Sequence, residues 1–117
     1  MLADIQEALS ETPAGSRELA EIVNRLVAAY HPDRVYLFGS KARGDAGPNS
    51  DYDLLVVVSE SGDPPYRRAQ HAQEALWGLW SAADVLVLTS AEVEARRSVP
   101  SSFVAAVLRE GKLLHVA

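Results

Sequence analysis

Two acidic residues open the second of two apolar stretches in the middle of the chain. Asp51 and Asp53 begin the run DYDLLVVV, and the earlier run YLF ends at Gly39 and Ser40. Residues two apart on a strand project to the same face, so these two carboxylates would lie close together. Such a pair is costly to bury unless a cation neutralises it, and ligands that are all oxygen suit Mg²⁺ or Mn²⁺. The spacing therefore predicts a divalent metal site.

The turn at Gly39 and Ser40 is suited to binding a phosphate. Glycine lets the backbone approach a phosphate closely, and the following N–H groups and the serine hydroxyl can donate hydrogen bonds to its oxygens. Lys41 and Arg43 follow in the same short basic stretch and would neutralise the remaining phosphate charge. A simple turn with solvated loop charges remains the alternative interpretation of these four residues.

The hydrophobic pattern predicts an alternation of helices and strands around these residues. Strands are expected at residues 34–38, 52–58 and 83–88, with a last edge strand at 112–116. Helices are expected at residues 2–10, from a cap at Ser16 to the break at His31, at 66–80, from a cap at Ser90 to Arg97, and from Ser101 to Gly111, with a single helical turn at 40–43. Trp77 and Trp80 lie three apart on one of these helices, and we expect both in the core; a surface that meets a partner is the alternative.

The connections predict how the strands pair. The link between the first two strands holds no long helix, so these strands should be antiparallel, whereas a helical crossover favours a parallel third strand. Asp84, at the start of that third strand, would then lie at the same sheet edge as Asp53 and Gly39. Three carboxylates at one edge could hold two metal ions for in-line phosphoryl or nucleotidyl transfer. Tyr52 should point to the opposite face, outside this site.

Bulk composition limits the class of protein. The chain has 117 residues, of which 48% are hydrophobic and 23% charged, as expected for one globular domain spanning residues 1–117. A net charge of −5 argues against binding held mainly by nucleic-acid phosphates, so no direct nucleic-acid partner is expected. There is no cysteine, which excludes disulfides and cysteine zinc sites. Neither a leader segment nor a membrane-spanning run is evident, so we expect a cytoplasmic protein.

The stretch GSKARGDAGPNSDYDLLVV resembles the signature of the DNA polymerase β-like nucleotidyltransferase superfamily, in which Gly-Ser is followed by ten residues and then Asp-x-Asp. Its Gly-Ser-x-Ala-Arg-Gly form is similar to the minimal nucleotidyltransferase (MNT, MntA-like antitoxin) group, and the match spans residues 34–88. The resemblance implies an α/β (α+β) fold with a small mixed sheet flanked by helices. It also implies magnesium as cofactor, with manganese as an alternative, and ATP as substrate.

Residue by residue, the resemblance implies that Asp51 and Asp53 bind metal, and that Asp84 helps to bind it and activates the acceptor hydroxyl. Gly39 and Ser40 would hold the triphosphate. Members of the MNT group are typically paired with a helical HEPN protein in a two-component toxin–antitoxin system. By this resemblance, the chain would be the antitoxin, which transfers AMP to a tyrosine of the HEPN toxin. The resemblance therefore implies a protein adenylyltransferase (AMPylation) that acts in a toxin–antitoxin system.

Three other functions stay open. The chain could be a small-molecule nucleotidyltransferase whose acceptor site is shared with another subunit or formed across a homodimer. It could instead be a non-catalytic antitoxin that neutralises its partner by binding. Metal-dependent hydrolysis of a nucleotide uses similar ligands, and turnover without an acceptor would indicate it.

Overall fold

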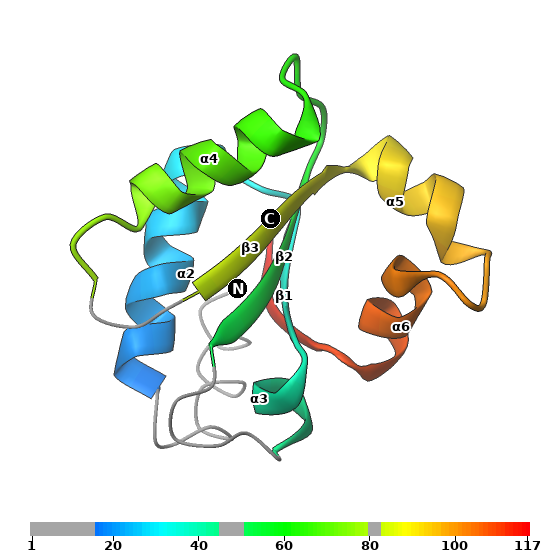
Figure 1. The fold of residues 1–117 in the computed structure, drawn as a ribbon, viewed down its shortest axis with the longest axis horizontal. Coiled ribbons are helices and arrows are strands. Elements are labelled where there is room, and N and C mark those ends of the chain that lie inside the picture. Colours follow the sequence, from blue (N-terminus) through cyan, green and yellow to red (C-terminus); the bar gives the residue numbers. More distant parts are fainter. Residues whose placement is uncertain (1–15, 45–50, 80–82) are drawn as a thin grey trace.

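A mixed four-stranded sheet organises the part of the chain that the computed structural model describes, residues 16–44, 51–79 and 83–117. Its strand order is β3-β2-β1-β4 (Figure 1). The strands are β1 (Arg34–Phe38), β2 (Tyr52–Val58), β3 (Ala83–Thr89) and β4 (Lys112–Val116). β1 pairs antiparallel with both β2 and β4, and β2 pairs parallel with β3. The predicted pairing is confirmed, and only β3 differs from its expected bounds, by one residue.

Helices cover both faces of this sheet. Figure 1 shows α2 (Ser16–Tyr30) and α4 (Pro65–Ala75) on one side of the strands and α5 (Ser90–Arg97) and α6 (Phe103–Glu110) on the other. The short helix α3 (Ser40–Arg43) lies at the end of β1. The fold class expected from the sequence, a small mixed sheet flanked by helices, is therefore confirmed.

The central strand β2 is buried on both faces. Leu54 and Val56 belong to the core that α2 and α4 cover, whereas Leu55 and Val57 belong to the core under α5 and α6. This alternation explains why the sequence of β2 is a continuous apolar run rather than an alternating one.

The connection between α4 and β3 differs from the sequence prediction. The helix ends at Ala75, five residues before the expected end, and Gly78 then adopts a left-handed conformation with φ +88°. Trp77 lies in this turn and is 84% exposed, so the prediction that it packs in the core is wrong. The physical reason is that Trp77 lies beyond the helix and therefore off the apolar stripe that the helical spacing defined. Trp80 and the helix expected at residues 2–10 lie outside the described residues.

Three helix starts also differ slightly from the expected positions, and the first is that of α4, which begins at Pro65 rather than Tyr66. Thr89, rather than Ser90, caps α5: its hydroxyl accepts from the Glu92 N–H while the Glu92 carboxylate accepts from the Thr89 N–H. Ser102, rather than Ser101, caps α6 by accepting from the Ala105 N–H. A run of adjacent hydroxyl residues offers several caps, and the reciprocal pair with Glu92 selects Thr89.

Glycine at position 111 allows α6 to pack closely on the sheet. A Cβ there would lie 2.6 Å from the Val107 carbonyl oxygen and 2.9 Å from that of Leu37. Both distances are shorter than any carbon–oxygen contact that packing tolerates, so only glycine fits. The end of α6 is thereby held against the end of β1.

A buried arginine joins α4, β3 and α5. The side chain of Arg68 is 7% exposed and donates to the carbonyl oxygens of Asp63 and Val87, at 3.0 Å each. It also donates to both carboxylate oxygens of Glu92, at 2.6 and 3.3 Å. The hydrogen bonds that Glu92 accepts from Arg68, and then those it shares with Thr89, lower the pKa of Glu92 from its ordinary 4.5 to about 2.

Glu92→Gln is expected to lower the free energy of unfolding at neutral pH by about 1–2 kcal/mol, discounted because the Glu92 side chain is 27% exposed. The folded-state pKa of Glu92 is depressed, so its stabilisation is complete above pH 4.5 and is lost as the pH falls toward 2. Urea titrations should therefore show the gap between wild type and variant narrowing below pH 4.5. A gap of constant size would contradict this account, and Glu94→Gln, at an exposed ion pair, is the control.

Candidate active site

Two aspartates stand side by side at one edge of the sheet. In the parallel pair of β2 and β3, Asp53 is directly opposite Asp84, and on its other side Asp53 is opposite Phe38 of β1. Asp53 lies two residues before Leu55 and therefore faces the α5–α6 side of the sheet. As expected, the end of β1 and the starts of β2 and β3 lie at the same edge of the sheet.

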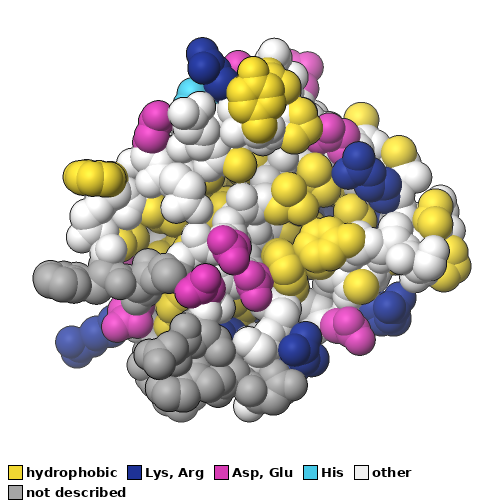
Figure 2. Space-filling model, in the orientation of Figure 1, with side chains coloured by type: hydrophobic (Ala, Val, Ile, Leu, Met, Phe, Trp, Pro, Cys, Tyr) yellow, Lys and Arg dark blue, Asp and Glu magenta, His cyan; other side chains and the backbone are white. Residues whose placement is uncertain are grey.

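The carboxylates at this edge influence one another. The pKa of Asp53 is raised, first by burial and then by the negative charges of Asp84 and Asp51, while the positive charge of Arg43 opposes the rise. Asp51 and Asp84 are exposed and Asp53 is partly buried. Figure 2 shows acidic side chains gathered on this face, where β2 and β3 begin. The edge is thus an open, negatively charged site.

Gly39 packs its backbone directly against Asp53. Its conformation, φ 76° and ψ −158°, belongs to a region that is essentially restricted to glycine. A Cβ added at this position would collide with Oδ2 of Asp53 and lie 3.2 Å from its Cγ. Position 39 therefore requires glycine for two independent reasons, and one of them is the carboxylate itself.

The turn after Gly39 is bounded by a second glycine. The N–H groups of Ala42 and Arg43 both donate to the Gly39 carbonyl oxygen at 3.1 Å. Gly44 ends α3 in the left-handed conformation, and its N–H donates a hydrogen bond to the Ser40 carbonyl oxygen. The repeated glycine of the sequence motif thus marks the two ends of one helical turn. This turn holds Ser40 immediately beside the Gly39–Asp53 contact.

The two basic residues of the turn lie in different surroundings. Nζ of Lys41 is 4.3 Å from the centre of the Tyr52 ring, and Tyr52 belongs to the core on the opposite face from Asp53, as expected. The charge of Arg43, in contrast, acts on Asp53, and Arg43 lines a small cavity together with Gly39. The structure therefore places Arg43, more directly than Lys41, beside the acidic edge.

The donor set at this edge fits a hard divalent cation. Asp51, Asp53 and Asp84 offer carboxylate oxygens only, and a cation would relieve the mutual repulsion that raises the Asp53 pKa. Within residues 16–44, 51–79 and 83–117, no three acidic or histidine side chains are gathered closely enough to enclose a metal ion. Mg²⁺ is usually held by one or two carboxylates together with substrate phosphates and water, so the facing pair Asp53 and Asp84 fits it without a third protein ligand.

A cavity of about 170 Å³ adjoins the acidic edge, and sequence reasoning missed the aromatic and acidic residues that line it. Phe38, Phe103 and Glu110 form its walls together with Gly39 and Arg43. The available signal was the spacing of Phe103 and Glu110, seven residues apart, which places them on one face of a helix. The sequence does not show which strand this helix face packs against, because that depends on contacts between residues far apart in the chain.

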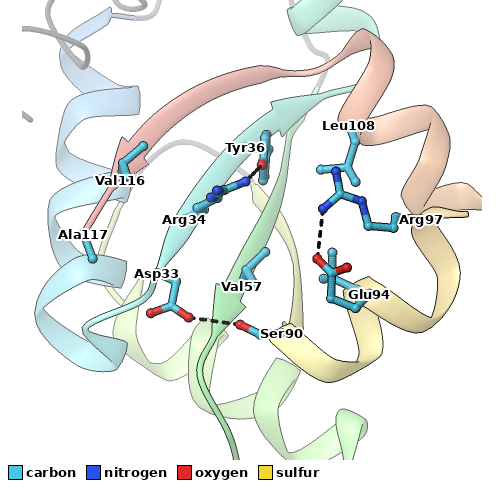
Figure 3. Close-up of a pocket in the computed structure, with 11 residues that line it drawn as sticks. Asp33, Arg34, Tyr36, Val57, Ser90, Glu94, Arg97, Leu108, Val116 and Ala117 are labelled. Carbon is cyan, nitrogen blue, oxygen red and sulfur yellow. Dashed lines mark hydrogen bonds and ion pairs between the residues drawn. The ribbon is translucent and has the colours of Figure 1, made fainter.

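A larger cavity, of about 380 Å³, lies at the opposite end of the sheet, where β1 begins and β2 ends (Figure 3). Its two acidic side chains already have partners: Asp33 accepts from the Ser90 hydroxyl at 3.0 Å, and Glu94 is paired with Arg97 at 2.9 Å. This cavity therefore has no convergent carboxylates comparable with those at the Asp53 edge.

The helices within the described ranges are all too short or too polar to cross a membrane.

Comparisons with known proteins relate the chain to a family and a fold. The sequence profile of the nucleotidyltransferase domain matches residues 16–113. No curated protein matches the chain. Among solved structures, a Sulfolobus solfataricus protein described as a candidate nucleotidyltransferase is 26% identical, with a TM-score of 0.54 over 79% of each chain.

Two further solved structures are of toxin–antitoxin proteins. One, described as a toxin–antitoxin with AMP-PNP, is 25% identical, with a TM-score of 0.53 over 84% of this chain and 73% of that one. The other, a mutant of the MntA–HpeT toxin–antitoxin, is 22% identical, with a TM-score of 0.52 over 84% and 72%, and supports the fold alone. The profile match covers most of the chain, so the chain belongs to the nucleotidyltransferase domain family.

Proposed function

We propose that this protein is a magnesium-dependent nucleotidyltransferase that transfers AMP from ATP to a hydroxyl group, namely a tyrosine of a HEPN-type toxin partner, and so acts as an antitoxin. The observation that carries the proposal is the register of Asp53 against Asp84, with Gly39 packed on the Asp53 carboxylate. Membership of the nucleotidyltransferase domain family supports the reaction class. The likeness to a toxin–antitoxin with AMP-PNP supports the nucleotide and the kind of partner.

Each residue at the edge would have a distinct role. The Gly39–Ser40 turn and Arg43 would hold the triphosphate, because backbone N–H groups, a hydroxyl and a guanidinium are all donors to phosphate oxygen. Asp51, Asp53 and Asp84 would hold Mg²⁺, which when bound would supply positive charge to stabilise the α-phosphate of the adenylyl group during its transfer. Lys41, which stacks on Tyr52, would contribute positive charge at longer range.

In the proposed reaction, the acceptor hydroxyl oxygen forms a bond to the α-phosphorus of ATP. The bond from that phosphorus to the bridging oxygen of the β-phosphate breaks, and pyrophosphate leaves with the bonding electron pair. The hydroxyl proton passes to Asp84. This carboxylate is exposed and so can be reached by a side chain of another protein.

Incubation with ATP, Mg²⁺ and the product of the adjacent gene is expected to add the mass of AMP to the partner. The Asp53→Ala variant should add none, because it lacks the carboxylate that lies between Gly39 and Asp84. Intact-mass measurement of both chains checks this, and Glu60→Gln, at an exposed site outside the edge, is the matched control.

The outcomes separate the competing functions. An unmodified partner that is nonetheless neutralised on binding would overturn the transfer reaction in favour of a non-catalytic antitoxin. Release of AMP without any acceptor would indicate hydrolysis instead. Transfer of AMP to a small hydroxyl compound, but not to the partner, would support nucleotidyl transfer as the reaction. It would overturn the proposal that the acceptor is a protein.

A further inference from the structure

We propose that the groove between α6 and the end of β1 binds the base of the nucleoside triphosphate, with Phe103 stacking on the base and Glu110 accepting a hydrogen bond from its exocyclic amino group. The proposal rests on the proposed function, because it concerns the nucleotide that the acidic edge would use. It assigns to Glu110 the selection of a base that carries an amino group, here the adenine of ATP.

One wall of the groove is a single stripe of α6. Its residues recur at the spacing of one helical face and are Phe103, Ala106, Val107 and Glu110. The stripe is about 10 Å long at the usual rise per residue, with an aromatic ring at one end and a carboxylate at the other. The opposite wall comes from Phe38, Gly39 and Arg43, which belong to the corner between β1 and α3.

Phe103 is only partly covered by its neighbours. It is 48% exposed, although one edge-to-face contact places its ring 5.0 Å from that of Phe38, with the planes at 80°. A half-exposed phenylalanine that packs edge-to-face on a second ring beside a cavity offers a surface for stacking, and base–aromatic stacking does not depend on base identity. Figure 2 shows hydrophobic side chains directly beside the acidic group, on the side toward α6.

The position and size of the groove suit a base attached to bound phosphates. Gly39 lines the groove and also packs on Asp53, so the groove opens next to the place proposed for the triphosphate. Arg43 lies on the same wall, and its charge acts on Asp53. A volume of about 170 Å³ is smaller than typical sites for whole ligands, so it fits one ring system rather than an entire nucleotide.

The carboxylate of Glu110 supplies selectivity. An ionised carboxylate only accepts hydrogen bonds, so it favours an amino group on the base and disfavours a carbonyl oxygen at the same position. Adenine carries an amino group where hypoxanthine carries an oxygen, and the two bases are otherwise alike in shape. ATP and ITP are therefore a matched pair of probes for this residue.

Calorimetric titration in the presence of Mg²⁺ tests the stacking surface. Wild-type protein is expected to bind AMP-PNP more tightly than inorganic tripolyphosphate, and Phe103→Ala should weaken AMP-PNP binding by about ten-fold. Phe103→Leu should weaken it similarly, because leucine keeps the apolar volume but removes the ring. Neither variant should alter tripolyphosphate binding. Tyr66→Ala removes an aromatic side chain that is 73% exposed on α4 and serves as the control.

A second titration tests Glu110. Wild-type protein should prefer ATP to ITP by about ten-fold, the discrimination usual for one well-placed polar contact to a base. Glu110→Gln should remove most of this preference, because an amide can also donate to the oxygen of hypoxanthine. Glu94→Gln, on α5 beside the distant cavity, should leave the preference unchanged.

The outcomes distinguish this proposal from the proposed function. Equal affinity for AMP-PNP and tripolyphosphate, or affinities that Phe103 variants do not change, would overturn the base site and leave nucleotidyl transfer intact. AMP-PNP binding that depends on Phe103 in a protein that transfers no AMP would support the base site and overturn the transfer reaction. Wild-type protein that binds neither ligand would overturn both.

Discussion

Asp53→Asn is expected to lower the rate of AMP transfer by about a thousand-fold while leaving the protein folded and no less stable than the wild type. The carboxylate lies opposite Asp84, and burial together with two negative neighbours raises its pKa. Asparagine keeps the shape and removes the charge, so it relieves like-charge repulsion across the strands, which typically costs about 0.2–1 kcal/mol. The free energy of unfolding should therefore stay constant or rise slightly.

Single-turnover rates and urea titrations of the same preparations measure these two effects. Glu60→Gln, at an exposed position after β2, is the control for removing a negative charge and should change neither quantity. A loss of folded protein large enough to explain the loss of transfer rate would contradict the account, because it would assign Asp53 a structural role. Retained activity would exclude Asp53 from the reaction.

Gly39→Ala is expected to be the most damaging single-methyl change at the site. Its backbone conformation costs about 1–3 kcal/mol for a residue with a Cβ, and the new methyl group would collide with the Asp53 carboxylate. The variant should therefore lose stability by at least that strain, and its activity should fall further than its folded fraction does. Urea titration and a transfer assay on the folded protein check both effects.

Other glycines separate the two causes. Gly44 shares a left-handed φ of +83° but has open space around it, so Gly44→Ala reports backbone strain alone. Gly62 has open space and an ordinary φ, so Gly62→Ala should be nearly neutral. In an Asp53→Ala background, Gly39→Ala should cost less stability than in the wild type, because the colliding carboxylate is gone. An additive double variant would contradict the proposed contact.

The sheet could be predicted from the sequence because its signals are local. The apolar run of β2 and the turn residues beside it set bounds at 52 and 58 that agree with the structure. The lengths of the connections fixed the antiparallel and parallel pairings, and hence the meeting of Asp53 and Asp84. The same alternation correctly placed Tyr52 on the opposite face.

Features that depend on contacts distant in the sequence were not predictable in this way. The apolar spacing of the fourth helix continues past Ala75, yet the chain turns there and leaves Trp77 exposed. The groove beside Gly39 needs Phe103 and Glu110 to meet the end of β1, which in turn requires Gly111 to pack against Leu37. The separate surroundings of Lys41 and Arg43 likewise follow from how one helical turn sits on the sheet edge.

The measurement that tests the central claim most directly follows the two ends of ATP separately. ATP labelled at the α- or the γ-phosphate is incubated with Mg²⁺, the protein and its partner, with Asp53→Asn and Glu60→Gln run in parallel. The account predicts α-label on the partner and γ-label in pyrophosphate, with both lost in Asp53→Asn and unchanged in Glu60→Gln. γ-Label on the partner, or transfer that persists in Asp53→Asn, would contradict it.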